Sequence, residues 1–235
     1  MPRVGRQAPG EVVYHVLNRG VGGMTLFEGD EDYAAFERVM RRSQDYEPQA
    51  RLLAYCLMPN HWHLVLRPRA DGELGRFMQR LTITHARRWQ EDRHATGSGH
   101  VYQGRFKSFP VQTDAHFLTV CRYVERNALR AGLVKRAEDW RWGSLWRWLH
   151  RRAGDREEGE RPVLSRWPVE RPRHWRALVN TALNDVEAEA LRLCMQRGRP
   201  YGSARWARGT ARRLGLESTF RSRGRPRTKS VKQSR

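Results

Sequence analysis

Two histidines that are two residues apart could bind a metal ion. His61 and His63 flank Trp62 in the segment HWHLVLRP, which follows the turn-forming pair Pro59-Asn60. Alternate side chains of a β-strand point to opposite faces, so both imidazoles share one face and Trp62 lies on the other. Two neutral ring nitrogens in this arrangement can bind one cation. Taken alone the pattern is short, and it is explained better by two polar residues on an exposed strand face.

A second pair of polar residues lies in the segment CRYVERNALRAGLV. Tyr123 and Asn127 are four residues apart, so they share one face of a helix predicted from Asp114 to Gly132. A tyrosine here could be a nucleophile, and the amide oxygen of Asn127 could complete a metal site. The neighbouring stripe of this helix is apolar and predicts a core contact; it consists of Phe117, Cys121, Val124 and Ala128.

The elements that must position these residues follow from the spacing of apolar side chains and from turn signals. The order is strand, helix, strand, strand, helix, strand, helix, over residues 11–17, 30–43, 50–58, 61–68, 72–93, 105–112 and 114–132. Its first six members match the ferredoxin-like, or RRM-like, pattern of the α+β class. We therefore expect an antiparallel sheet with helices on one face, and the helix over 114–132 as an addition.

The remainder of the chain divides by composition. We expect a catalytic domain over 1–150, a helical extension over 151–220 and a disordered basic tail over 221–235. Within the extension, helices predicted over 185–197 and 203–214 flank an Arg-Gly-Arg-Pro segment and could form a helix-turn-helix-like pair. A second Arg-Gly-Arg-Pro, at 223–226, resembles a minor-groove hook.

The charge of the chain indicates an anionic partner. Forty-five Lys and Arg face 25 Asp and Glu, which gives a formal net charge of +20. Such an excess repels itself, and phosphate neutralisation by nucleic acid is the common reason for it.

Several classes of protein are disfavoured by what the sequence lacks. The three cysteines form no C-x-x-C pair, which argues against a disulfide framework or a cysteine zinc site. No signal peptide, apolar span or P-loop is recognisable. We expect a cytoplasmic protein with no membrane partner and no nucleotide cofactor.

Taken together, the motifs resemble those of REP-associated tyrosine transposases, within the single-tyrosine HUH superfamily. The matching segments are YHVLNRG, MPNHWHLVL, GHVYQGRFKS, YVERNALRAGLV and the basic segments after residue 196. They span nearly the whole chain in the family's order. The resemblance implies an HUH endonuclease fold and a transposase that cleaves and rejoins single-stranded DNA at palindromic, REP-like hairpins.

The resemblance also implies a mechanism. His61, His63 and Asn127 would hold a divalent cation, Mg²⁺ or Mn²⁺, and the two imidazoles suit Mn²⁺ somewhat better. Tyr123 would attack the scissile phosphate and form a 5′-phosphotyrosine. Residues expected to contact DNA are Arg19, Arg105, Lys107, Arg130, Arg199, Arg223 and Arg225. Either a monomer or a homodimer is compatible with the sequence, and a monomer is favoured.

Two other functions remain open at this point. One is a nicking endonuclease of the same chemistry with weak rejoining. The other is a non-catalytic module that binds single-stranded nucleic acid on an RRM-like sheet. Modules of that kind carry aromatic motifs on their strands, and the nearest segment, GRFKSFPV, does not match them.

Overall fold

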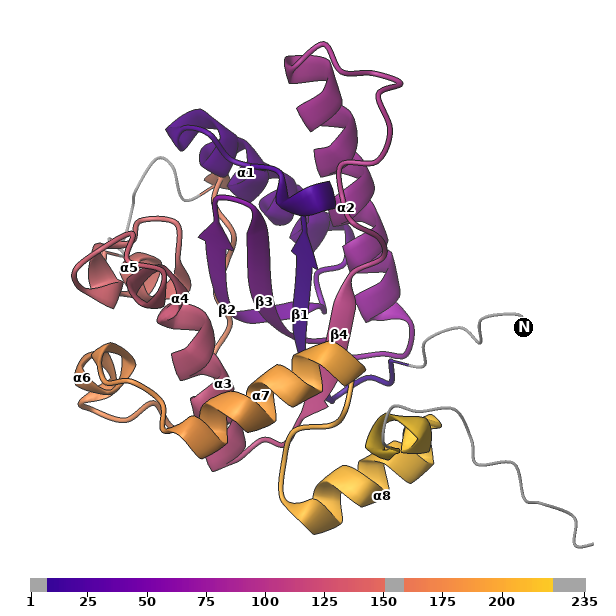
Figure 1. Ribbon diagram of the computed structural model, residues 1–235, viewed down its shortest axis with the longest axis vertical. Coiled ribbons are helices and arrows are strands. Elements are labelled where there is room, and N and C mark those ends of the chain that lie inside the picture. The colour runs from indigo at the N-terminus through magenta and orange to yellow at the C-terminus, as the bar shows by residue number, and fades with distance from the viewer. Residues whose placement is uncertain (1–7, 151–158, 222–235) are drawn as a thin grey trace, which may run out of the picture.

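The computed structural model describes residues 8–150 and 159–221 (Figure 1). Its strands are β1 (Val13–Arg19), β2 (Arg51–Met58), β3 (His61–Arg67) and β4 (Lys107–Val111). Its helices are α1 (Asp30–Tyr46), α2 (Glu73–Asp92), α3 (Ala115–Glu125), α4 (Asn127–Arg130), α5 (Ser144–Leu149), α6 (Trp175–Asn180), α7 (Asp185–Arg197) and α8 (Ala204–Leu214), with single 3₁₀ turns at Val21–Gly23, Ala137–Asp139 and Glu217–Phe220.

The four strands form one antiparallel sheet in the order β2-β3-β1-β4. This is the ferredoxin-like topology predicted from the order of elements. The register places Leu17 of β1 opposite both His63 of β3 and Lys107 of β4. Since side chains directly opposite one another share a face, the histidine face of the sheet also carries His15, two residues before Leu17.

One face of the sheet is covered by α1 and α2. Trp62, Leu64 and Leu66 point to this side and are fully buried with the apolar stripes of the two helices. The Trp62 indole donates a hydrogen bond to the Tyr102 hydroxyl at 3.1 Å, so its one polar atom is satisfied in the core. The predicted placement of Trp62 beneath the helices is confirmed.

The opposite, histidine-bearing face is covered as well. Phe117, Cys121, Val124 and Ala128 of α3 and α4 are buried against the sheet in a second apolar cluster, together with Trp175 of α6 and Leu191 of α7. The two helices of the ferredoxin-like pattern thus lie on one face, as expected. The additional helix, with α6 and α7 of the C-terminal extension, forms a further layer on the other face, and α8 lies below the end of the sheet in this view (Figure 1).

The extension also pairs locally with both edge strands of the sheet, where backbone groups would otherwise be unpaired. On β2, the Ser165 amide donates to the Leu52 carbonyl at 2.8 Å. On β4, the Tyr201 amide donates to the Pro110 carbonyl at 2.8 Å and its carbonyl accepts from the Gln112 amide at 2.9 Å. The domain boundary at residue 150 stays a prediction, and these contacts show that the described part of the extension packs closely on the sheet.

Some expectations concern residues beyond this description. The predicted disordered tail, including Arg223 and Arg225, lies outside the described residues except for Arg221. Among the residues that are described, no helix is both long and apolar enough to cross a membrane.

Candidate active site

The two histidines of the HWH segment lie side by side on β3. The ring centroids of His61 and His63 are 5.1 Å apart and the rings are nearly perpendicular. His63 is buried, with 2% of its surface exposed, whereas His61 is partly exposed. The pair therefore lies at the rim of the layer that α3 forms over the sheet, where a substrate could reach one ring directly.

Each of these imidazoles is held through its Nδ1 atom. His61 Nδ1 hydrogen bonds to the Asn60 side-chain oxygen at 2.7 Å, and His63 Nδ1 hydrogen bonds to His15 Nε2 at 2.9 Å. No hydrogen bond among the described residues engages the Nε2 atom of either ring. Metal-binding histidines commonly show this pattern, in which an outer hydrogen bond orients the ring. The Asn60 oxygen can only accept, so it sets the tautomer of His61, whereas either ring can donate in the bond between His15 and His63.

The protonation states also suit metal binding. Burial, followed by repulsion from Arg19 and Arg130, lowers the pKa of His61 to about 4. Burial lowers the pKa of His63 well below its usual value, and His15, His61 and Arg130 add to the effect. Both rings are thus neutral at physiological pH, and the neutral imidazole is the form that coordinates a cation. Among the described residues, no group of three His, Cys, Asp or Glu side chains is placed to hold a metal ion, so His61 and His63 would need a further ligand of another type.

Tyr123 of α3 lies directly over the histidines. Its ring meets His63 edge-on, with centroids 5.8 Å apart, and meets His15 in the same way at 6.4 Å. Burial raises the pKa of the phenol, while Arg130 and Arg192 lower it. Tyr123 and His63 are 60 residues apart in the chain, and the fold brings their rings into contact.

Asn127 is adjacent to Tyr123, as its spacing predicted, and is completely buried. Its amide nitrogen donates to the Tyr123 carbonyl at 3.0 Å, and its Oδ1 accepts a hydrogen bond from Arg130 at 2.8 Å. The oxygen that would complete a metal site is therefore engaged by Arg130 in this structure. Its role as a third ligand stays a prediction, and it requires Arg130 to release that oxygen.

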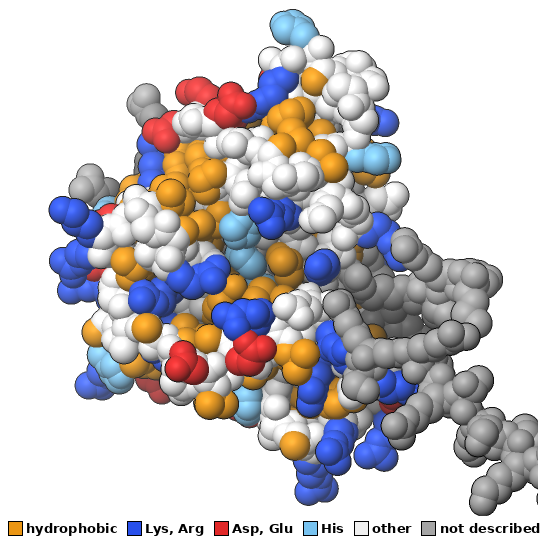
Figure 2. Space-filling model, in the orientation of Figure 1, with side chains coloured by type: hydrophobic (Ala, Val, Ile, Leu, Met, Phe, Trp, Pro, Cys, Tyr) orange, Lys and Arg blue, Asp and Glu red, His pale blue; other side chains and the backbone are white. Residues whose placement is uncertain are grey.

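Basic side chains surround the histidines on this face of the molecule (Figure 2). Arg19 ends β1 opposite His61, Lys107 lies on the same sheet face, and the Arg130 guanidinium is 5.2 Å from the centroid of the Tyr123 ring. Arg105 is exposed in the loop before β4. Arg199 lies further along the chain, 4.0 Å from the Phe220 ring, and no contact among the described residues joins it to Tyr123 or the histidines.

His15 is a site residue that the sequence motifs did not single out. Its ring stacks on His63 with centroids 5.0 Å apart, and its Nε2 shares a hydrogen bond with His63 Nδ1. Burial lowers the pKa of His15 to about 3. The signal available in the sequence was a single polar residue within the otherwise apolar strand VVYHVL, and its pairing partner could not be read from that segment alone.

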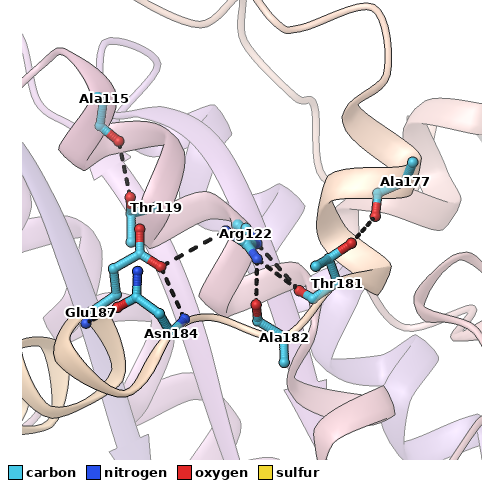
Figure 3. Close-up of polar contacts among 8 residues, drawn as sticks. All are labelled: Ala115, Thr119, Arg122, Ala177, Thr181, Ala182, Asn184 and Glu187. Carbon is cyan, nitrogen blue, oxygen red and sulfur yellow. Dashed lines mark hydrogen bonds and ion pairs between the residues drawn. The ribbon is translucent and has the colours of Figure 1, made fainter.

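Arg122, the residue before Tyr123, fastens the extension to this helix (Figure 3). Its guanidinium donates to the Thr181 carbonyl at 2.9 Å and to the Ala182 carbonyl at 2.6 Å, and it lies 3.9 Å from the Glu187 carboxylate. Glu187 in turn closes the capping box that begins α7. The start of α7 is thereby fixed against the helix that carries Tyr123.

Helix α8 presents a row of arginines to solvent. Ala207, Ala211 and Leu214 are buried, while Arg205, Arg208, Arg212 and Arg213 are exposed on the opposite side. An exposed basic helix of this kind suits contacts with nucleic-acid phosphates. The description of α7 and α8 as a DNA-binding pair remains a prediction.

We expect the double substitution Arg205→Gln with Arg208→Gln to weaken binding of hairpin DNA and to reduce the slope of log affinity against log salt by about 2, because each phosphate contact contributes about 1. Fluorescence anisotropy over a salt series measures both quantities. The matched control is Arg42→Gln with Arg87→Gln, which removes two exposed arginines from α1 and α2. An equal effect of the two double variants would show that only net charge matters.

A family model matches the part of the chain that carries these residues. The model of the family described as "Transposase IS200 like" matches residues 11–127, about half of the chain. A comparison with curated protein sequences gave no match.

Two solved structures are similar in part. One is a REP-associated tyrosine transposase bound to a REP hairpin, 16% identical, covering 78% of this chain and 93% of its own, with a TM-score of 0.48. The other is a candidate transposase from Deinococcus radiodurans, 18% identical, covering 56% of this chain and 92% of its own, with a TM-score of 0.38. Through residues 11–127, the segment that contains both histidines, Tyr123 and Asn127, the chain belongs to the IS200-like transposase family.

Proposed function

We propose that this chain cleaves and rejoins single-stranded DNA by way of a 5′-phosphotyrosine at Tyr123. The observation that supports this most directly is the contact of the Tyr123 ring with His63, across 60 residues of sequence. A tyrosine whose role was only to fill the core would not need two neutral imidazoles and an arginine around it. A tyrosine that attacks a phosphodiester needs neighbouring groups that activate it, because a free phenol is a weak nucleophile.

Tyr123 and Arg130 have different roles in that reaction. Tyr123 Oη forms a bond to phosphorus, and the bond from phosphorus to the 3′-oxygen breaks. The phenolic proton is lost to solvent, and the departing 3′-oxygen gains a proton. Arg130 lies over the Tyr123 ring and favours the ionised phenol, since a nearby cation stabilises a phenolate. Rejoining is the reverse reaction, so it needs no nucleotide cofactor.

A divalent cation, Mg²⁺ or Mn²⁺, fits the donor atoms of His61 and His63, with Asn127 as the proposed third protein ligand. When bound, such a cation polarises the scissile phosphate and makes it more electrophilic. His15 and Asn60 hold the two imidazoles with their Nε2 atoms available. Their contribution is to fix the ligands before the substrate arrives.

The proposed substrate is a palindromic DNA that forms a single-stranded hairpin, as the resemblance to REP-associated transposases implies. A single copy of the chain supplies both the nucleophile and the histidines, which supports a monomer as the working unit. The excess of basic residues, with its net charge of +20, supports DNA rather than a small anion as the partner.

A non-catalytic module on an RRM-like sheet is less well supported. Modules of that type stack bases on aromatic side chains of an open sheet face. Here the strands are buried on both faces by α1 and α2 on one side and by α3, α6 and α7 on the other. The described part of the sheet thus offers no open face on which bases could stack.

The proposal is tested with a single-stranded hairpin labelled at its 3′ end, because the strand that becomes attached to Tyr123 retains that end. With Mn²⁺, we expect a labelled covalent adduct that survives denaturing electrophoresis. Removal of the cation by EDTA should abolish the adduct and leave hairpin binding measurable. A 5′-labelled strand in a parallel reaction should yield a shorter fragment that ends in a 3′-hydroxyl.

Two results would count against this function. A cleavage product without a protein adduct would indicate attack by water. Tight hairpin binding with neither cleavage nor adduct, under any divalent cation tested, would favour the binding module.

A further inference from the structure

Two adjoining pockets lie between the helical segment that carries Tyr123 and the C-terminal extension, and Tyr123 itself lines the first of them. The first has a volume of about 360 Å³ and is lined on one side by Tyr123, Arg126 and Arg130 and on the other by Leu183, Arg192 and Met195. The second has a volume of about 430 Å³ and is lined by residues that include Arg126, Lys135, Arg136, Arg176 and Asn180. Arg126 is a wall of both, so the two pockets adjoin at this side chain.

The linings of both pockets are basic, and neither contains an acidic side chain. Acidic groups do act nearby: Glu138 lies 2.8 Å from Arg136 and 3.8 Å from Arg176, and Glu189 pairs with Arg192. These carboxylates partly neutralise the outer arginines. Arg126 and Lys135 have no ion-pair partner among the described residues.

Arg126 is the member of this group that most needs an anion. Its Nη1 atom is buried and makes no hydrogen bond in the described structure. Burial and the proximity of Arg122 and Arg130 lower its pKa. The Arg126 side chain as a whole is partly exposed, but its Nη1 is shielded from solvent. Because a guanidinium stays charged at any physiological pH, this unpartnered N–H near two other arginines carries an unfavourable desolvation energy.

The first pocket also has an apolar side. Leu183 and Met195, with Ala182 and Ala188, face the arginines across the cavity. A free inorganic anion would gain no binding energy from this apolar surface. A nucleotide, in contrast, presents a phosphate on one side and a less polar sugar and base on the other. The combination favours a nucleotide within a strand over an isolated phosphate.

We propose that these two pockets form a track for the single strand that flanks the cleaved phosphate, with one phosphate held by Arg126 where the pockets meet. This inference deepens the proposed function, since it takes single-stranded DNA as the ligand. The extension thereby contributes directly to substrate binding: Arg192 of α7 lines the first pocket and Arg176 of α6 the second. Arg122, which fastens the start of α7 to α3, would keep the track assembled.

The experiment uses the full chain in EDTA, so that no cleavage takes place and binding is measured independently of catalysis. The probe is a fluorescein-labelled oligothymidylate of about 20 nucleotides, followed by anisotropy over a salt series. We expect Arg126→Gln to weaken binding about tenfold, because a hydrogen bond between charged groups contributes on the order of one such factor. The salt slope should fall by about 0.7, the value for one phosphate of a single strand.

Two further variants test whether the effect of Arg126→Gln comes only from a loss of folding or of net charge. Arg192→Gln changes an exposed side chain of α7 and should weaken binding in the same direction, with an unchanged melting temperature. Arg42→Gln removes one exposed arginine from α1, on the other side of the sheet, and should leave affinity and slope close to those of the unaltered chain.

The position of the strand is then mapped by cross-linking. An oligothymidylate that contains 4-thiothymidine is irradiated with the bound protein, and the attached peptides are identified by mass spectrometry. We expect attachment within 182–195 or 126–136. Attachment only elsewhere, or Arg126→Gln and Arg192→Gln variants that bind like Arg42→Gln, would overturn the track. The adduct assay would remain a separate test of the catalytic proposal.

Discussion

Replacement of Tyr123 by phenylalanine is expected to abolish the covalent protein–DNA adduct while leaving affinity for hairpin DNA within about twofold. The phenyl ring preserves the edge-on contacts with His63 and His15, so the packing of α3 over the histidines should be unchanged. Only the hydroxyl oxygen, the proposed nucleophile, is removed. Without the nucleophile the rate should fall by several orders of magnitude, as for other enzymes that lose the attacking atom.

Denaturing electrophoresis with the 3′-labelled hairpin measures the adduct, and anisotropy measures the affinity. Tyr46→Phe is the matched control, because Tyr46 is an exposed tyrosine at the end of α1 on the opposite layer. This variant should form the adduct at the normal rate. An adduct formed by the Tyr123→Phe protein would show that another side chain is the nucleophile.

Much of the fold could be predicted from local sequence patterns. Alternation along β3 separated Trp62 from the two histidines, and the helical stripe of Phe117, Cys121 and Val124 identified the buried side of α3. These patterns depend on burial within one element, which the sequence displays directly. The left-handed backbone of Gly132, with a φ of 73°, likewise ends the helical segment where the sequence indicated.

The contacts between distant elements could not be predicted in the same way. The hydrogen bond between His15 and His63 depends on the register of β1 against β3, which no local pattern specifies. Glu125 is a second example. Its buried carboxylate accepts hydrogen bonds from Ser144 at 2.6 Å and from the Trp175 indole at 2.7 Å, and so connects α5 and α6 to the helix that carries Tyr123.

The position of the C-terminal extension could not be predicted from local patterns either. Its helices were visible in the sequence as separate amphipathic segments, and a basic composition suggested a role in DNA binding. Nothing local indicated that α7 would lie across the sheet and line a pocket with Tyr123. That placement depends on Arg122 bonding to two carbonyl groups about 60 residues away, which are backbone acceptors without a sequence signature.

The second large effect is expected at the histidines. His63→Ala should remove saturable binding of Mn²⁺ and, with it, adduct formation, because one of only two imidazole donors is lost. His15→Phe should keep the ring packing against Phe109 and His63 but remove the hydrogen bond to His63 Nδ1. Loss of such an outer partner typically costs 10–100-fold in metal affinity. Isothermal titration with Mn²⁺ separates the two outcomes without any reaction.

The control for both variants is His100→Ala, which changes an exposed histidine in the loop before β4 and should bind Mn²⁺ normally. A His15→Phe protein with full affinity for Mn²⁺ would reduce His15 to a packing residue. Intermediate affinity, together with adduct formation restored at high Mn²⁺, would identify it as a positioning residue. In that case the pairing of β1 with β3 would set the geometry of the proposed metal ligands. Strand β1 would then contribute to catalysis by orienting His63 through His15.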